Sequence, residues 1–303
     1  MSEMTAFQRK TADIFPEIEL RFSEPLSRHT SFRIGGAAEV MAFPKNREEL
    51  AYLLKQSCLL DVSPVILGAG TNVLAPDDGV QGLVICLKDC LNGMERLDET
   101  HIQVMAGVTM ARAAVFAANA GLSGLEFAHG IPGTVGGGVY MNAGAYGGEM
   151  RQICQQVEVM DEQGSLSVLS NRELAFSYRH SVLEDRRYVA VSTVFCLEPK
   201  ETNEIREKMK ELMTKRTASQ PLNLPSAGSA FKRPASGYAA ALIDQAGLKG
   251  FRVGGAAISE KHAGFAVNLG GATAADVREL LAQVSNRVFE ASGILLEPEI
   301  RIW

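Results

Sequence analysis

The sequence predicts an α+β protein of two or three domains. Its 303 residues can fill more than one hydrophobic core. Helix-like and strand-like stretches alternate irregularly, and no segment repeats with a period of about 20–50 residues. The irregular order excludes a barrel and favours an α+β arrangement. Hydrophobic residues make up 46% of the chain and charged residues 21%, as in ordinary globular proteins.

The first predicted region, 1–88, contains three strands and one helix. Asn46 with Glu49 three residues later is a typical helix start, and Leu50, Leu53 and Leu54 then supply one apolar face. The strand-like runs of this region are 39–43, 65–68 and 83–87.

The second predicted region, 89–200, begins with an alternating strand at 101–105. A helix follows, with Thr109 as its cap and Gly121 as its stop. Its later part predicts a hairpin and one long strand. These strands are expected at 157–161, 165–169 and 188–197, with the hairpin turn at 162–164.

The third predicted region, 201–303, opens with a charged helix at Glu201–Arg216 that connects to a last compact part, 217–303. There Ser236 and Thr273 have the residue type of helix caps. We expect helices at 236–247 and 273–291 and strands at 264–269 and 294–302.

Charge and composition exclude several classes of function. The net charge is −5 and the pI about 5.7, which argues against nucleic acid or an anionic membrane as the main partner. The N-terminal residues lack the apolar stretch of a secretion signal, and no uncharged apolar run approaches about 18 residues. Five cysteines without a C-x-x-C pair and five histidines without metal-ligand spacing predict no disulfide and no metal. We therefore expect a cytoplasmic protein.

Glycine is concentrated in two loops. Residues 130–148 hold eight of the 29 glycines, and Gly68–Leu74 follows an apolar run at 64–67. Glycine lets consecutive N–H groups point at an anion such as a pyrophosphate, so the two loops suggest one phosphorylated cofactor held from two sides. Neither loop has the dinucleotide-binding or P-loop pattern. The alternative is that these glycines serve tight turns and close packing.

Three further segments carry polar residues that composition does not require. Arg179 lies between aromatic residues, and it is either a surface cation–π contact or a fixed fork for a carboxylate. Ser229 either caps a turn or places a hydroxyl next to two cations. Glu299 is either a solvated charge at a strand end or part of a site. Their spacing alone does not show that they meet.

Taken in order, these motifs resemble the UDP-N-acetylenolpyruvoylglucosamine reductase family. The resemblance covers the chain from about residue 25 to its end and is closest to the shorter branch, which lacks an inserted substrate-covering loop. The segments that carry it are 29–36, 68–74, 130–137, 142–147, 177–179, 227–232, 261–268 and 296–301.

The resemblance implies a flavoprotein of peptidoglycan precursor synthesis. It implies a vanillyl-alcohol oxidase-type (PCMH-type) FAD-binding domain of two subdomains, 1–88 and 89–200, followed by an α+β substrate-binding domain, 201–303. NADPH would reduce a non-covalent FAD, and reduced flavin would convert the enolpyruvyl ether of UDP-N-acetylglucosamine to UDP-N-acetylmuramate. This pathway links the enzyme to cell wall biogenesis, cell shape and cell division. Its partners would be NADPH and a UDP-sugar, with no nucleic acid, membrane or obligate protein partner.

The resemblance also implies the site residues. Arg179, Ser229 and Glu299 form the catalytic set: Arg179 stabilises the substrate carboxylate, Ser229 protonates C2, and Glu299 assists the same intermediate. The residues implied for cofactor binding are Gly68, Ala69, Gly70, Thr71, Asn72, Val73, Leu74, Gly130, Ile131, Pro132, Gly133, Thr134, Val135, Gly137, Asn142, Gly144, Ala145, Arg216 and Arg301. Those on the substrate side are Lys232, Arg233 and His262.

Two other functions remain open at this stage. An FAD oxidase or dehydrogenase of the same fold would keep the glycine loops but would not require Ser229 together with Glu299. A non-catalytic nucleotide-binding protein would require none of the three catalytic candidates.

Overall fold

The computed structural model describes residues 4–88 and 90–303. The chain divides into two compact units, each built from three separate segments. Unit 1 comprises 1–22, 39–69 and 82–215, and unit 2 comprises 23–38, 70–81 and 216–303. The predicted domains are three continuous stretches of chain, so they do not correspond one to one with these two units. The three-domain division stays a prediction.

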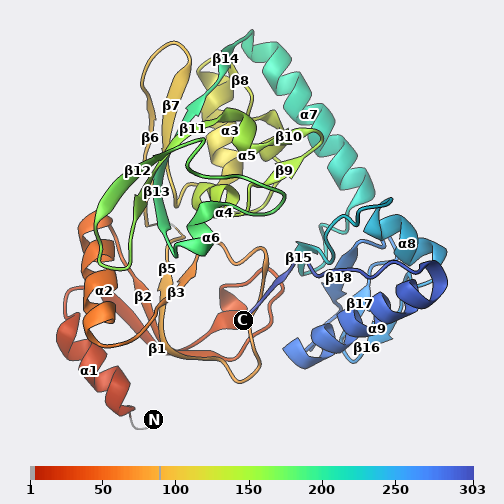
Figure 1. The fold of residues 1–303 in the computed structure, drawn as a ribbon, viewed down its shortest axis with the longest axis horizontal. Coiled ribbons are helices and arrows are strands. Elements are labelled where there is room, and N and C mark those ends of the chain that lie inside the picture. The colour runs from red at the N-terminus through yellow and green to blue at the C-terminus, as the bar shows by residue number, and fades with distance from the viewer. Residues whose placement is uncertain (1–3, 89) are drawn as a thin grey trace. The chain divides into compact units, whose positions relative to one another are not determined.

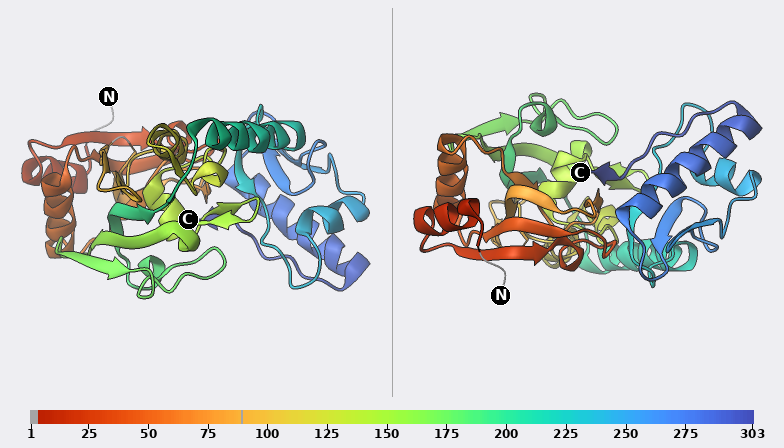
Figure 2. Two further views of the ribbon diagram at one scale, coloured as in Figure 1. Left: turned by 90° about the horizontal axis from the view of Figure 1, so that it is seen from above. Right: turned by 90° about the horizontal axis from the view of Figure 1, so that it is seen from below.

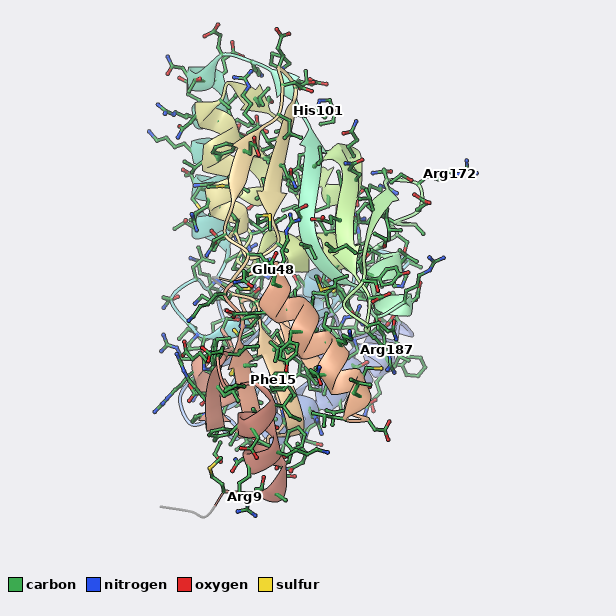
Figure 3. The ribbon with its side chains drawn as sticks, turned by 90° about the vertical axis from the view of Figure 1, so that its left-hand side faces the viewer. Arg9, Phe15, Glu48, His101, Arg172 and Arg187 are labelled. Carbon is green, nitrogen blue, oxygen red and sulfur yellow. The ribbon has the colours of Figure 1, made fainter. Side chains whose placement is uncertain are left out.

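The first layer of unit 1 is a four-stranded sheet of order β1-β2-β5-β3 with two helices against it (Figure 1). Its elements are β1 (Glu19–Pro25), β2 (Ala37–Phe43), β3 (Val65–Leu67), β5 (Val80–Cys86), α1 (Ala6–Ile14) and α2 (Arg47–Leu59). Leu50, Leu53 and Leu54 of α2 are buried in the same core as Val40 and Ile85 of the strands. Phe15, labelled in Figure 3, packs edge-on against Tyr52 of α2 with ring centroids 5.6 Å apart.

The second layer of unit 1 is a five-stranded antiparallel sheet of order β12-β11-β13-β7-β6. Its strands are β6 (Met94–Arg96), β7 (His101–Met105), β11 (Cys154–Met160), β12 (Leu166–Ser170) and β13 (Val189–Cys196). Every residue of the central strand β13 except its last is buried. Helix α4 (Val135–Tyr140) contacts β13.

Short elements complete unit 1 and surround the glycine-rich run. They are β8 (Leu122–Ser123), a 3-10 helix (Glu126–Ala128), α3 (Met110–Asn119), β9 (Gly144–Ala145), β10 (Gly148–Glu149), α5 (Met150–Ile153), α6 (Val182–Asp185), β14 (Glu198–Pro199) and α7 (Thr202–Ser219), whose last turn belongs to unit 2.

Unit 2 has its own core, between a four-stranded sheet and helix α9 (Ala274–Ser292). The sheet has the order β15-β18-β17-β16, and α9 lies beside it in Figure 2. Two further strands, β4 and β19, pair in parallel. The remaining bounds are β4 (Val73–Leu74), β15 (Ser226–Ser229), β16 (Arg252–Val253), β17 (Ala256–Ile258), β18 (Phe265–Asn268), β19 (Arg301–Ile302), α8 (Ala239–Gln245) and a 3-10 helix (Leu26–Arg28).

Predictions that depend on local chemistry are confirmed. The side chains of Asn46, Thr109 and Thr273 each accept a hydrogen bond from the backbone N–H three residues on, and each starts the expected helix. The strand at 101–105 has the expected bounds, and β11 pairs with β12 as the expected hairpin. Gly121 has φ +70° after α3, as a helix stop requires.

Three local predictions are wrong. Ser236 does not cap a helix: α8 begins at Ala239 after Tyr238, because Gly237 at φ +81° interrupts the chain before it. Only Arg301–Ile302 of the predicted strand 294–302 is a strand, and Pro298 forms an isolated bridge with Phe231. The glycine-rich run is not a continuous loop, because Val135–Tyr140 forms α4.

Candidate active site

The two glycine-rich loops meet within unit 1. A Cβ placed on Gly68 would lie 2.9 Å from Oγ1 of Thr134, so a side chain at position 68 would force this hydroxyl to move. The first loop continues through Gly70, whose φ of +60° favours glycine. The sequence predicted two loops on one cofactor, and the close approach of Gly68 to Thr134 is the geometry that such a shared site needs.

The second loop is fixed by main-chain bonds on both sides of Thr134. Gly133 has φ +129°, a conformation that side chains rarely adopt, and its carbonyl accepts from Met110 N at 3.0 Å. Val135 N donates to Val108 O at 2.8 Å, and the Thr134 hydroxyl accepts from Gly137 N at 3.3 Å. Thr134 thereby starts α4 inside a sequence that glycine alone would leave flexible.

Asn142 follows α4 with its side chain turned inward. It is 1% exposed, has φ +41°, and its backbone N–H donates to Val139 O at 3.1 Å. Its Nδ2 donates to Glu149 Oε2 at 3.1 Å and to the Ser177 carbonyl at 2.9 Å, and its Oδ1 accepts from Arg151 N at 3.0 Å. Both amide hydrogens bond to protein acceptors. A hydrogen bond donated by Asn142 to a cofactor would therefore have to come from its main chain.

Gly144 and Ala145, also predicted to bind the cofactor, form β9 of a tight hairpin. β9 pairs with Gly148–Glu149, and the two residues at the tip, Tyr146 and Gly147, have φ +54° and +88°. Positive φ at both positions is typical of the type I′ hairpin turn. A Cβ on Gly144 would lie 2.7 Å from the Gly148 carbonyl, so glycine is needed for the strands to approach.

Arg179 lies at the tip of a two-residue turn, Ser177–His180, which we call the Arg179 turn. Ser177 N donates to His180 O at 3.1 Å and His180 N to Ser177 O at 3.3 Å. Arg179 has φ +58°, a backbone conformation that costs a non-glycine residue roughly 1–2 kcal/mol. Its guanidinium lies 5.0 Å from the ring centroid of Tyr178, so the cation–π contact considered from the sequence exists.

The catalytic candidates of unit 2 lie on neighbouring segments. Ser229 is half-buried at the end of β15, opposite Phe265 of β18, and the next residue, Ala230, donates its N–H to Gly264 O at 2.8 Å. Glu299 N donates to the Ala230 carbonyl at 2.9 Å. The structure thus brings Glu299 beside the residue that follows Ser229, although 69 residues separate Ser229 from Glu299 in the sequence printed above.

The first glycine loop supports the segment that contains Glu299. Asn72 Nδ2 donates to the Glu299 carbonyl at 3.4 Å, and the Asn72 carbonyl accepts from Arg301 N at 2.9 Å. Ser31 is tied to the same loop, because its N–H donates to Gly70 O at 3.0 Å. Its hydroxyl donates to Ser226 O at 2.6 Å, which links the loop to the strand of Ser229.

The three predicted substrate-side residues have different surroundings in unit 2. The Lys232 ammonium forms an ion pair with Glu297, and exposed Arg233 stacks 4.1 Å from the ring centroid of Tyr238. His262 Nδ1 accepts from Gly264 N at 3.1 Å, which places the proton of the neutral ring on Nε2. Burial, with a smaller contribution from Lys249, lowers the pKa of His262 and favours this neutral form.

Two arginines predicted to face the cofactor are also in unit 2. Arg216 is buried in the last turn of α7, and Arg301 lies in β19 opposite Val73. Arg301 therefore neighbours the first glycine loop through the backbone. The cofactor role of both residues stays a prediction.

Other searches of the described residues are negative. Residues 4–88 and 90–303 contain no group of three or more His, Cys, Asp or Glu side chains able to hold a metal ion. Within the same residues, no helix is long and apolar enough to cross a membrane. All five cysteines are described, and none forms a disulfide.

Sequence reasoning missed several residues that hold the candidate site together. Ser181 donates its hydroxyl to the Tyr140 carbonyl at 2.8 Å, and Ser31 makes the link described above. Asp77 accepts from Ala274 N at 2.7 Å and Ala275 N at 3.0 Å, which adds a second cap to α9. Their partners are distant in sequence, and each lies among other polar residues, so no local pattern marked them.

Two family models match the chain. The model described as "FAD binding domain" matches residues 38–170, and the model described as "UDP-N-acetylenolpyruvoylglucosamine reductase, C-terminal domain" matches residues 220–303. They confirm the predicted α+β fold with a flavin-binding domain of the vanillyl-alcohol oxidase type.

Full-length relatives agree with these matches. A UDP-N-acetylenolpyruvoylglucosamine reductase of Caldanaerobacter subterraneus subsp. tengcongensis is 44% identical over 293 residues, 97% of this chain and 96% of the relative. One of Streptococcus pneumoniae is 43% identical over 295 residues, 97% of each chain. The crystal structure of the Thermus caldophilus enzyme of this name superimposes with a TM-score of 0.78 at 37% identity, covering 95% of this chain and 99% of that one. The chain therefore belongs to the UDP-N-acetylenolpyruvoylglucosamine reductase family.

Proposed function

We propose that this protein uses NADPH to reduce the enolpyruvyl ether of UDP-N-acetylglucosamine, producing UDP-N-acetylmuramate and NADP⁺. The C=C bond gains a hydride at C3 and a proton at C2, so the reaction is a two-electron reduction. Family membership supports the substrate, and the neighbouring positions of Ser229 and Glu299 in unit 2 are the observation that carries the chemistry.

The glycine loops fit a flavin dinucleotide bound without a covalent link. A Cβ at position 68 would force the Thr134 hydroxyl to move, and Gly133 keeps a backbone conformation that only glycine adopts readily. The residues proposed to hold FAD are the segments 68–74 and 130–135, with Gly137, Asn142, Gly144, Ala145, Arg216 and Arg301. These residues would hold the group that, when bound, would supply hydride transfer from NADPH to C3 of the enolpyruvyl group.

Arg179 is proposed to bind the substrate carboxylate. Negative charge moves onto this carboxylate as C3 accepts hydride, and a planar guanidinium can hold both oxygens at once. The Arg179 turn presents the guanidinium from a backbone with φ +58°. A conformation of this kind persists only where the surrounding structure supports it, and such positions are concentrated at functional sites.

Ser229 is proposed to donate the proton to C2, with Glu299 assisting the same intermediate. A free serine hydroxyl is a weak acid, so it needs a strongly basic intermediate and a fixed position. Its strand supplies the position, because Ala230 is bonded on one side to Gly264 and on the other to Glu299. Lys232, whose ammonium is paired with Glu297, and Arg233 and His262 are proposed on the substrate side.

We place this activity in peptidoglycan precursor synthesis in the cytoplasm, where it would affect cell shape and cell division. The proposed partners are small molecules, NADPH and the UDP-sugar. No nucleic acid, membrane or protein partner is required for this reaction.

The test is an anaerobic spectrum of the purified protein recorded in three steps. We expect a flavin spectrum at first, loss of the oxidised flavin absorbance on adding NADPH, and its return on adding the enolpyruvyl substrate. Return of the oxidised absorbance with other oxidants but not with this substrate would favour a different oxidoreductase of the same fold. A colourless protein that takes up no FAD would identify a non-catalytic protein.

A further inference from the structure

The Arg179 turn is attached to the end of α4 at two points. On its N-terminal side, the Ser177 carbonyl accepts from Asn142 Nδ2 at 2.9 Å. On its C-terminal side, Ser181 donates its hydroxyl to the Tyr140 carbonyl at 2.8 Å. Asn142 is 1% exposed and Ser181 is 0% exposed, so water does not compete for either bond. α4, which ends just before Asn142, and α6, which begins just after Ser181, lie side by side in Figure 1.

The orientation of the Asn142 amide is determined by its three partners. Arg151 N–H can only donate, so Oδ1 must face it. The Ser177 carbonyl and the Glu149 carboxylate can only accept, so Nδ2 must face both. A flipped amide, or a carboxylate in its place, would set acceptor against acceptor at the Ser177 carbonyl.

Neither bond is needed to form the elements at its ends. Asn142 ends α4 through its backbone, with φ +41° and its N–H on Val139 O, and a glycine would satisfy this position equally well. The Arg179 turn is closed by its own Ser177–His180 bonds. The two side-chain bonds therefore determine where the turn lies relative to α4 and leave its conformation unchanged.

We propose that Asn142 and Ser181 are positioning residues that clamp the Arg179 turn onto the C-terminal end of α4. The inference rests on the proposed function, because it assumes that Arg179 binds the substrate carboxylate. The clamp connects the helix that begins at the second glycine loop directly to Arg179. It thereby places the group that recognises the substrate relative to the segment proposed to hold the flavin.

The first experiment compares Asn142→Gly and Asn142→Asp in the FAD-loaded enzyme. Glycine keeps the positive φ and removes the amide, whereas aspartate keeps the shape and removes both donors. Ser181→Ala, which removes the other clamp bond at a residue with no proposed cofactor contact, should retain FAD and be reduced by NADPH at near wild-type rates. In the two Asn142 variants, both half-reactions are measured on the FAD-loaded fraction, and reoxidation is compared with reduction by NADPH in the same variant. Reoxidation by the enolpyruvyl substrate should slow by about tenfold or more, since small displacements of a positioning group are costly to rate. Wild-type reoxidation in Asn142→Gly would overturn the proposal.

Asn171→Asp is the matched control. Asn171 also donates from Nδ2 to two backbone carbonyls of unit 1, Arg151 O at 2.9 Å and Cys154 O at 2.6 Å, but it makes no bond to the Arg179 turn. Asn171→Asp should be less stable than the wild type, but its reoxidation by the enolpyruvyl substrate should proceed at the wild-type rate. If Asn171→Asp slows reoxidation as much as Asn142→Asp, the effect is general destabilisation and the clamp is rejected.

A double-mutant cycle separates this inference from the proposed function. Arg179→Ala alone tests the proposed function: an unchanged reoxidation rate removes Arg179 from the catalytic set. If Arg179→Ala slows the step, adding Asn142→Gly or Ser181→Ala to it should produce little further loss, because a positioning residue acts through Arg179. Fully additive losses would show that the clamp residues act elsewhere.

Hydrogen exchange gives a readout that does not depend on turnover. In Asn142→Gly and Ser181→Ala, amides in the segment 176–182 should exchange faster than in wild type, with the five-stranded sheet unchanged. In Asn171→Asp that segment should exchange as in wild type. Unchanged exchange at 176–182 in both clamp variants would contradict the proposal.

Discussion

Arg179 and Ser229 are held in place by different kinds of hydrogen bond. Arg179 of unit 1 lies on a turn attached to α4 through two side chains, Asn142 and Ser181. Ser229 of unit 2 lies at the end of a strand whose neighbours are joined through main-chain groups, Ala230 to Gly264 and Glu299 to Ala230. Truncating one side chain can therefore remove a bond that holds the Arg179 turn, whereas the main-chain bonds beside Ser229 and Glu299 involve no side chain.

The largest effect is expected from removing the Ser229 hydroxyl in unit 2. Ser229→Ala should lower the rate of reoxidation by the enolpyruvyl substrate about 10³-fold, as for loss of a general acid, with reduction by NADPH nearly intact. Stopped-flow absorbance resolves the two half-reactions. Ser226→Ala, on the same strand, should behave like wild type. An equal fall in both half-reactions would remove Ser229 as the proton donor.

Arg179→Lys should have the next largest effect, about 10² on the same half-reaction. An ammonium keeps the positive charge but cannot bind both carboxylate oxygens in one plane, and it is a weaker partner for the Tyr178 ring. Substrate titration of the oxidised enzyme, followed by the flavin spectrum, should show weaker binding as well. Near-normal turnover would show that the fork geometry of Arg179 is unimportant.

Ser31→Ala is the counterpart, in unit 2, of the clamp substitutions in unit 1. It removes the hydroxyl bond to the Ser226 carbonyl but leaves the main-chain bond of Ser31 to Gly70. Urea unfolding should show a loss of about 1 kcal/mol, typical of one hydrogen bond. Reoxidation should slow less than in Asn142→Gly, because main-chain bonds still align Ser229. A larger loss of reoxidation rate than in Asn142→Gly would contradict the proposed difference between the two units.

The smallest effect is expected from protonation of His262, whose side chain supports the Ser229 strand. His262 Nδ1 accepts from Gly264 N, and the carbonyl of Gly264 accepts from Ala230 N. Because burial lowers the pKa of folded His262 below its usual value of 6.5, the unfolded chain takes up a proton first as the pH falls. The stabilisation is complete above about pH 6.5 and is lost progressively below it.

Urea midpoints at pH 7.5 and 5.5 test this expectation. His262→Asn keeps an acceptor for Gly264 N–H but does not titrate. The midpoint should therefore fall further between the two pH values in wild type than in His262→Asn. Identical falls in the two proteins would show that protonation of His262 does not weaken this part of unit 2.

Local chemistry made much of the fold predictable. Asn46, Thr109 and Thr273 were recognisable as helix starts because a cap bonds a backbone group three residues away. The hairpin of β11 and β12 was recognisable because its alternation and its turn are adjacent in sequence. The start of α8 was not, because the left-handed backbone at Gly237 overrode the capping propensity of Ser236.

The candidate site was less predictable than the elements that carry it. The resemblance indicated Arg179, Ser229 and Glu299, but it did not indicate how each is held. Glycine density indicated freedom of the backbone at 130–148, yet α4 forms there because Thr134 caps it and Val108 and Ala106 supply carbonyls from another segment. Bonds of that kind cannot be inferred from composition.

Most helix starts, the types of group available for chemistry and the two glycine-rich segments could be predicted from the amino-acid sequence. It could not predict that Gly68 approaches Thr134, that Glu299 lies beside Ala230, or that Asn142 reaches Ser177 across 35 residues. The reason is physical: capping and periodicity act between near neighbours in the chain, whereas these contacts depend on how whole strands and helices pack.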